Sequence, residues 1–216
     1  RGKMADSKKL TIMVSSTVYG IEELLDRIYT LLTAFGYDVW MSHKGTVPVF
    51  SNCSALENCI KATEKCDLFL SLITTRYGSG KEDDGISFTH QELLKAIELN
   101  KPRWLLSHDH VVFARSLLIN LGYKGKDGRK KLALKKSNPV IENLRVIDMY
   151  EDAILSKIPL GERGGNWVQK FGSIDDAALF ATAQFSRYQE VEEFVKENFR
   201  DSALISQAVK DKRGRK

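Results

Sequence analysis

The sequence contains no long apolar run. None of its apolar segments approaches the roughly 20 residues that a helix needs to cross a bilayer, and the N-terminal segment has no apolar stretch of the secretory type. We therefore expect a cytoplasmic protein with no membrane partner. We take Met4 as the natural start, because the residues ahead of it resemble an added prefix.

Cysteine and histidine are scarce, at three and four residues. Cys53, Cys59 and Cys66 show none of the short C-x-x-C spacings of zinc or thioredoxin-like sites, which favours free buried thiols over ligands or disulfides. His108 and His110 are spaced for chelation but have no carboxylate or cysteine partner at a recognisable spacing. We therefore expect no metal site.

A complete phosphate-binding loop is also missing. Gly78-Ser79-Gly80-Lys81 resembles one, but that motif needs a glycine where this chain has Thr75 and a serine or threonine where it has Glu82. This departure excludes a P-loop NTPase.

Charge is unevenly distributed along the chain. The 216 residues are 43% hydrophobic and 28% charged, which suffices to bury the core of one large domain. The net charge of +5 is concentrated in a basic segment at 124–136 and a basic tail at 210–216. Without interleaved aromatic residues, such runs more often form solvated loops or frayed ends than nucleic-acid sites. We expect no nucleic-acid partner.

Strand and helix patterns alternate in the first half of the chain. Predicted strands cover residues 10–14, 37–41, 67–73 and 103–106, and predicted helices cover residues 21–35, 53–65 and 109–120, with another around Glu92. This order predicts right-handed crossovers and an α/β fold, a three-layer sandwich with a mainly parallel, flavodoxin-like central sheet.

The second half has a different character. After Gly122 no further strand pattern occurs, and a last long helix is predicted over residues 175–199. We therefore expect an α/β domain over residues 4–122, a C-terminal helical extension over residues 123–200 that packs on it, and a flexible basic tail over residues 201–216.

Polar residues follow the predicted strands and surround the start of the helix of Glu92. Because parallel strands deliver their following loops to one edge of a sheet, where open α/β folds bind ligands, we expect these residues to converge. They are Ser15, Ser16, Thr17, Tyr19, Tyr77, Gly78, Ser79, Ser87, Thr89 and Glu92. Hydroxyls and amides suit a phosphate or a ribose, and one carboxylate can stabilise positive charge on an anomeric carbon. The pattern predicts N-glycosidic cleavage or transfer, with Glu92 as the reacting group.

Simpler roles stay open for the same residues. Ser15-Ser16-Thr17 fits the N-cap of the helix that follows, and Gly78 fits a turn. Glu92 fits a solvated charge on a helix face. His90 precedes Glu92 by two residues, a separation at which helical side chains point in different directions, so a direct His–Glu pair is not expected.

Four motifs occur in order: Val14-Ser15-Ser16-Thr17-Val18-Tyr19, Cys66-Asp67-Leu68-Phe69-Leu70, Tyr77-Gly78-Ser79, and Ser87-x-Thr89-x-x-Glu92 followed by Lys101-Pro102. Together they resemble a bacterial family of unknown function that is often fused to STAND-type signalling NTPases. That family is similar in turn to TIR domains and nucleoside 2-deoxyribosyltransferases. The resemblance covers about Leu10 to Leu106 and carries the catalytic role of the relatives' glutamate onto Glu92.

Two features of the relatives have no single counterpart here. The acidic residues usual in deoxyribosyltransferases correspond only to Asp83 and Asp84. The aromatic residue with which enzymatic TIR domains stack on the base corresponds to Tyr19, Trp40 or Tyr77, and spacing does not choose among them.

The resemblance implies a TIR-like nucleotide N-glycosidase, either a NAD hydrolase or an enzyme that cleaves a nucleoside or nucleotide at its ribose, as an effector in bacterial antiviral defence. NAD or a related nucleotide is then the substrate, and no cofactor is expected. Glu92 would steady the ribose and the oxocarbenium-like transition state, while Ser15, Ser16, Thr17 and Ser79 hold phosphate or ribose. TIR-like domains also self-associate or bind partners. The alternative is a non-catalytic interaction or nucleotide-signal-binding module, with a homo-oligomer or a signalling protein as partner.

Overall fold

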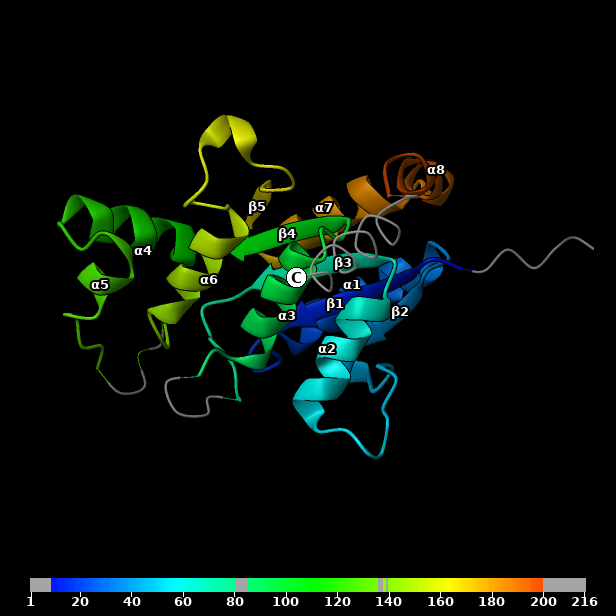
Figure 1. Cartoon of the computed structure of the whole chain (residues 1–216), viewed down its shortest axis with the longest axis horizontal. Helices are drawn as coiled ribbons and strands as arrows, with labels where there is room; N and C mark the ends of the chain where they lie inside the picture. Colours follow the sequence, from blue (N-terminus) through cyan, green and yellow to red (C-terminus); the bar gives the residue numbers. More distant parts are fainter. Residues whose placement is uncertain (1–8, 81–84, 136–137, 139, 200–216) are drawn as a thin grey trace, which may run out of the picture.

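A computed structural model describes residues 9–80, 85–135, 138 and 140–199 of the chain. Figure 1 shows a central sheet with helices on both faces. The sheet has five strands in the order β2-β1-β3-β4-β5, and every neighbouring pair is parallel. The strands are β1 (Thr11–Ser16), β2 (Asp38–Met41), β3 (Leu68–Ile73), β4 (Arg103–His108) and β5 (Val168–Phe171). The predicted three-layer α/β fold with a mainly parallel sheet and a helical C-terminus is confirmed.

Two groups of helices cover the two faces of the sheet. The first contributes to one apolar cluster and contains α1 (Glu22–Ala34), α7 (Ile174–Phe185) and α8 (Tyr188–Phe199). The second contributes to the other and contains α2 (Ala55–Lys65), α3 (Phe88–Glu98), α4 (Asp109–Asn120) and α6 (Arg145–Ala153). Short helices are η1 (Ser42–Lys44), α5 (Gly125–Arg129) and η2 (Leu160–Glu162). No helix in the described part of the chain is long and apolar enough to span a membrane.

The strands belong to this sheet because their side chains suit burial on two sides. All six residues of β3 are buried, as expected for a central strand of a parallel sheet covered on both faces. In β1, Ile12 and Val14 pack into the cluster of α1, while Met13 packs into the cluster of α2 and α3. Because successive side chains alternate between faces, Ser15 lies on the same face as Met13. This alternation aims a hydroxyl at α3.

The fifth strand contradicts the prediction that no strand follows Gly122. β5 lies parallel to β4, so the sheet takes an edge strand from the segment predicted as a helical extension. It has only four residues, and two of them are Gln169 and Lys170, so its apolar pattern is too short to stand out.

One predicted helix is also wrong. The long helix predicted over residues 175–199 is two helices, α7 and α8, separated at Ser186 and Arg187. The helix predicted over residues 109–120 is α4, whose N-cap residue is His108.

The basic segment is more ordered than the expected solvated loop. Its residue Arg129 ends α5, is buried, and forms ion pairs with Asp148 and Glu151 of α6. These pairs fix α5 against α6. The basic tail and Lys136 lie outside the described residues.

Candidate functional site

Glu92 is a buried carboxylate. The alternative that it is a solvated charge on a helix face is wrong. The residue Glu92 is only 6% exposed, and its carboxylate accepts a hydrogen bond from the Oγ of Ser15, a residue that is 1% exposed. Burial raises the pKa of Glu92 above its ordinary value, and hydrogen bonds from Ser15 and Cys59 offset part of that shift. A buried acid with a shifted pKa, held by a hydroxyl, is typical of functional sites.

The fold brings this pair together over 77 positions of the chain. Ser87 caps the start of α3, and Leu93 and Ala96 pack that helix onto the sheet. Glu92 is thereby directed at the carboxyl end of β1, where Ser15 is the last buried residue. The polar pair lies between α3 and the sheet rather than at the open surface.

Two more polar side chains belong to this region, Cys59, which hydrogen-bonds to Glu92, and Ser71, which lies beside Ser15 in the sheet. Burial, together with the Glu92 carboxylate, raises the pKa of the Cys59 thiol on α2 to about 12, so this thiol stays protonated. Ser71 of β3 is paired in register with Ser15 and therefore faces the same side of the sheet. Its Oγ is buried and has no hydrogen-bond partner among the described residues. The Glu92 site thus contains a hydroxyl whose hydrogen-bonding capacity is unused.

The predicted convergence of the loops after β1 and β3 with the start of α3 is present. Thr17 Oγ1 lies 2.7 Å from Thr74 Oγ1. Gly78 has a φ of +88°, and a Cβ there would lie 2.8 Å from Thr17 Cγ2 and 3.7 Å from Thr89 Oγ1. Gly78 is therefore more than a turn glycine, because its missing side chain lets the two loops approach each other. Ser87 and Thr89 are buried beside it.

Other predicted residues do not join this group through their side chains. Tyr19 is 75% exposed. Ser16 Oγ donates to the carbonyl oxygens of Thr17 and Leu72. Ser79 is exposed, and its carbonyl oxygen accepts from the N–H of Phe88. The N-cap role suggested for Ser15-Ser16-Thr17 is wrong, since α1 follows Ile21 and has no side-chain cap. Asp83 and Asp84 lie outside the described residues.

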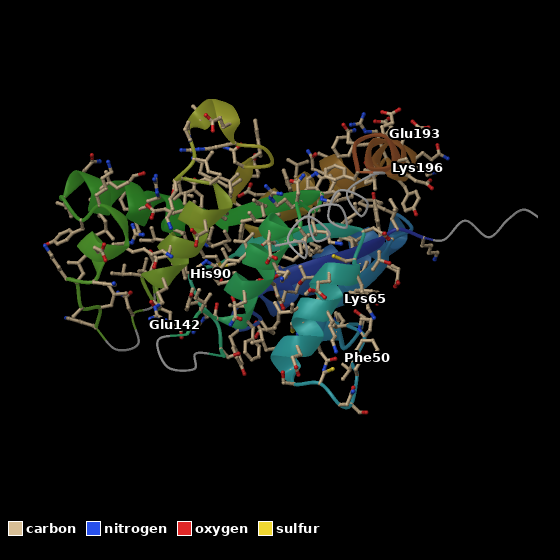
Figure 2. All side chains as sticks on the ribbon, viewed as in Figure 1. Phe50, Lys65, His90, Glu142, Glu193 and Lys196 are labelled. Carbon is tan, nitrogen blue, oxygen red and sulfur yellow. The ribbon has the colours of Figure 1, made fainter. Side chains whose placement is uncertain are left out.

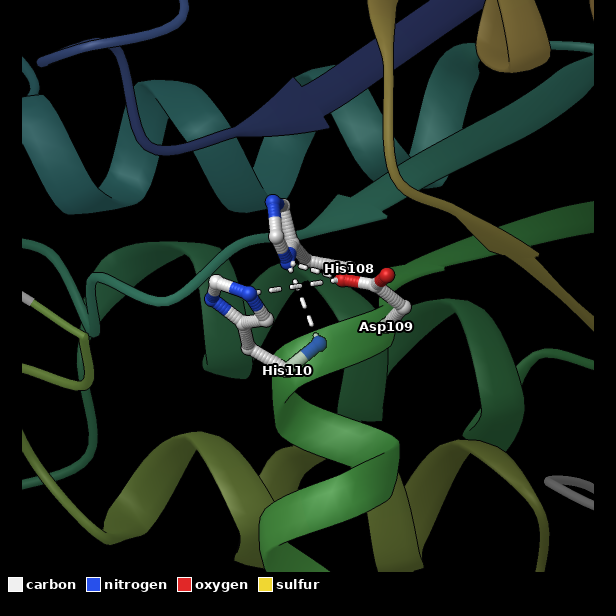
Figure 3. A group of neighbouring side chains, drawn as sticks. All are labelled: His108, Asp109 and His110. Atoms are coloured by element: carbon white, nitrogen blue, oxygen red, sulfur yellow. Dashed lines mark hydrogen bonds and ion pairs between the residues drawn. The ribbon is translucent and has the colours of Figure 1, made fainter.

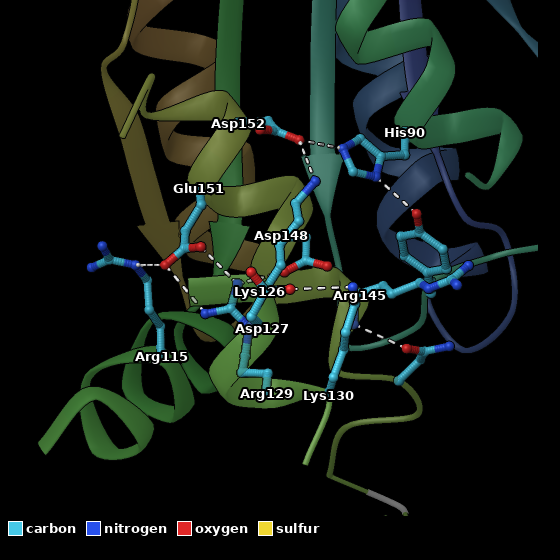
Figure 4. Close-up of polar contacts among 12 residues, drawn as sticks. His90, Arg115, Lys126, Asp127, Arg129, Lys130, Arg145, Asp148, Glu151 and Asp152 are labelled. Carbon is cyan, nitrogen blue, oxygen red and sulfur yellow. Dashed lines mark hydrogen bonds and ion pairs between the residues drawn. The ribbon is translucent and has the colours of Figure 1, made fainter. Parts of the chain in front are cut away.

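Tyr77 and His90 belong to a second polar group on the other side of α3. Tyr77 Oη lies 2.8 Å from His90 Nδ1, and His90 Nε2 lies 3.0 Å from Asp152 Oδ2 of α6. Figure 4 shows His90 directed at Asp152. Burial alone would raise the pKa of Asp152, but His90 and Lys126 outweigh it and hold that pKa below the ordinary value. The sequence contained no signal for Asp152, which follows His90 by 62 positions.

A cavity of about 670 Å³ lies beside this second group, between α3, α5 and α6. Tyr77 and His90 line it, and Figure 2 shows His90 and Glu142 on this side of α3. Glu92 lines none of the three main cavities among the described residues. We expected Tyr77 and Glu92 to share one pocket, and the structure separates them. Residues two apart on a helix differ by about 200° in direction, so His90 faces α6 while Glu92 faces β1 and α2.

A third cluster lies at the end of β4. Ligand atoms of His108, Asp109 and His110 all lie within 4.8 Å of one another. Figure 3 shows the three side chains side by side at the start of α4. His108 Nδ1 is 3.0 Å from Asp109 Oδ1 and accepts a hydrogen bond from the N–H of His110. Asp109 is therefore a carboxylate partner of these histidines, which the sequence spacing did not predict. Asp109 and His110 are exposed, and burial lowers the pKa of His108.

Much of the chain matches a known protein family. Residues 11–153, about two thirds of the chain, match a family described as a domain of unknown function, DUF4062. The matched region runs from the first residue of β1 to the last residue of α6. It therefore contains Ser15, Glu92 and the cavity beside His90. No match was found among curated proteins.

Proposed function

The chain belongs to the DUF4062 family, and we propose that it is a TIR-like nucleotide N-glycosidase with Glu92 as its catalytic carboxylate. The observation that carries the proposal is the buried Glu92–Ser15 pair at the carboxyl end of β1. Ligands of open α/β folds bind at that edge of the sheet. The preferred substrate is NAD, with related nucleosides and nucleotides as the wider class.

The chemistry needs one well-placed carboxylate. The bond between ribose C1′ and the nicotinamide nitrogen breaks, and its electron pair stays with nicotinamide, which leaves as a neutral molecule. The ribose becomes an oxocarbenium ion, whose positive charge the Glu92 carboxylate stabilises. Water then forms a new bond to C1′ and loses a proton, for which Glu92 is the acceptor. No general acid is needed for the leaving group.

The environment of Glu92 supports both parts of this role. Burial strengthens the interaction of a carboxylate with developing positive charge, because water does not screen it. The raised pKa makes Glu92 a better proton acceptor than an exposed glutamate. Ser15 Oγ–H holds the carboxylate in place, and a ribose hydroxyl is a donor of the same kind. Ser71 offers a second hydroxyl on the same face of the sheet.

The test is release of nicotinamide or free base. The protein at high concentration is incubated with NAD and with a panel of nucleosides and nucleotides, and the products are separated by chromatography. Glu92→Gln is expected to lower the rate by at least about 100-fold, the usual contribution of a proton-transfer or charge-stabilising group. Glu98→Gln is the matched control, since Glu98 lies on the same helix, is exposed, and pairs only with Lys95 in the described structure. No turnover by folded protein, or equal turnover in Glu92→Gln, would refute the proposal.

A catalytically silent, self-associating module is the second candidate. It is favoured by an exposed apolar row formed by Phe113 and Leu117 of α4 and its C-cap residue Leu121, which recur every four residues. Light scattering after size-exclusion chromatography tests it. If the row joins two copies of the chain, Leu117→Glu is expected to convert a dimer to a monomer. A wild-type protein that stays monomeric at high concentration would contradict this candidate. The role in antiviral defence is a proposal that rests on the resemblance, and the cytoplasmic setting is a proposal that rests on the composition of the sequence.

A further inference from the structure

We propose that the cavity between α3, α5 and α6 is a second binding site, which takes a small organic phosphate and is distinct from the site of Glu92. Its volume of about 670 Å³ lies within the usual range of small-molecule sites. Both halves of the chain contribute to its wall. The first half supplies α3 and the loop before it, and the second half supplies α5 and α6.

Cations predominate on the wall of this cavity. Four cationic side chains line it, Lys126, Arg129, Lys130 and Arg145, against the two carboxylates of Glu142 and Asp148. The acidic partners Asp127, Glu151 and Asp152 do not line the cavity. Figure 4 shows this group of charged side chains gathered on α5 and α6. Four cations against two carboxylates in the lining favour an anion there, while Lys126, Arg129 and Lys130 also pair with carboxylates outside the lining.

Three of these cationic side chains have N–H donors that are not occupied by hydrogen bonds to the described residues. Lys126 Nζ lies 3.7 Å from Asp152 Oδ2, which is longer than a direct hydrogen bond, and its side chain is 44% exposed. Lys130 pairs only with exposed Asp127 in the described structure, and its side chain is 77% exposed. Arg129 is buried, and its Nε–H has no partner among the described residues. A buried donor without an acceptor favours binding of an anionic oxygen.

Part of the remaining wall is apolar and offers a surface for the body of the ligand. It is formed by Ile86, Leu132, Leu134 and Leu144. An inorganic anion alone would leave these side chains uncovered. A molecule that joins a phosphate to a ring or another weakly polar body fits both halves of the cavity, and a mononucleotide is a representative of that class.

The site is separate from Glu92 but shares a helix with it. His90 contacts Asp152 at the cavity, and Glu92, two residues later, contacts Ser15 on the opposite side of α3. Removal of the Glu92 charge is therefore expected to leave binding at the cavity unchanged.

The test is isothermal titration calorimetry of the full chain with ADP, adenosine and inorganic phosphate. ADP is expected to bind with a dissociation constant that rises with salt, and adenosine and inorganic phosphate are each expected to bind at least tenfold more weakly. The double variant Lys126→Ala/Lys130→Ala is expected to weaken ADP binding at least tenfold. Lys170→Ala/Lys196→Ala removes two exposed lysines far from the cavity lining and is expected to leave binding unchanged.

Three other results would overturn the proposed phosphate site. Absence of ADP binding to folded wild-type protein at millimolar concentration overturns it. Equal affinities of the two double variants overturn the assignment to this cavity. Loss of binding in Glu92→Gln means that ADP occupies the glycosidase site instead, whereas a lack of turnover with intact ADP binding refutes only the proposed enzyme. Protection of α3 and α6 amides from hydrogen exchange in the presence of ADP is a second expected readout.

Discussion

The substitution Ser15→Ala tests whether Glu92 is an ionisable group held by a buried hydroxyl. Both residues are buried, so the variant removes the donor without supplying water in its place. A hydrogen bond to a charged group contributes about 1.5–3 kcal/mol to stability, and a bond between neutral groups about 0.5–1.5 kcal/mol. The loss of free energy of unfolding is therefore expected to depend on the ionisation of Glu92.

The direction of the pH effect follows from the pKa. Burial raises the pKa of Glu92, so the carboxylate is neutral at pH 4 and ionises as the pH rises through the raised value. Ser15 favours the ionised form, and its removal raises the pKa further. Ser15→Ala is therefore expected to destabilise the protein by about 1.5–3 kcal/mol where Glu92 is ionised and by about 1 kcal/mol where it is neutral, so the loss is expected to be larger at pH 8 than at pH 4.

Urea unfolding at pH 4 and pH 8 measures the effect. Ser16→Ala is the matched control, because Ser16 Oγ donates only to backbone carbonyl oxygens in the described structure. The loss of stability in this variant is expected to be independent of pH. In a Glu92→Gln background the pH dependence of Ser15→Ala is expected to vanish. An equal loss at both pH values, or a pH dependence that survives in Glu92→Gln, would refute the reasoning.

Two further predictions concern the same edge of the sheet. The pKa of Glu92 is higher in the folded than in the unfolded protein. The stability that this difference contributes to the folded state is present at low pH and is lost as the pH rises through the folded pKa. Glu92→Gln is therefore expected to gain stability relative to wild type between pH 4 and pH 8 in urea unfolding, and a constant difference would contradict the pKa shift. Gly78→Ala is expected to destabilise by about 1–3 kcal/mol, since its φ is +88° and the new Cβ meets Thr17. Gly45→Ala is the control and is expected to lose less stability in thermal unfolding. Its φ of +66° is also unfavourable for alanine, but no atom lies within 4 Å of the new Cβ.

Much of the fold could be predicted because its signals are local. Four strands, the helices between them and the parallel sheet follow from apolar periodicity, which each segment carries by itself. The approach of Glu92 to Ser15 followed from a general property of parallel sheets, whose loops meet at one edge. The short strand β5 was missed because a four-residue edge strand with polar members has almost no periodic signal.

What the sequence determined by itself is therefore the layered α/β architecture and the acidic residue at the carboxyl edge of its sheet. Only the tertiary structure decided that Asp152 meets His90, that Arg129 is buried between two carboxylates, and that Tyr77 lines a cavity on the far side of α3 from Glu92. The physical reason is that periodicity reports which face of an element is buried. It does not report which distant side chain packs against that face, because such pairing depends on how the second half of the chain folds back onto the sheet.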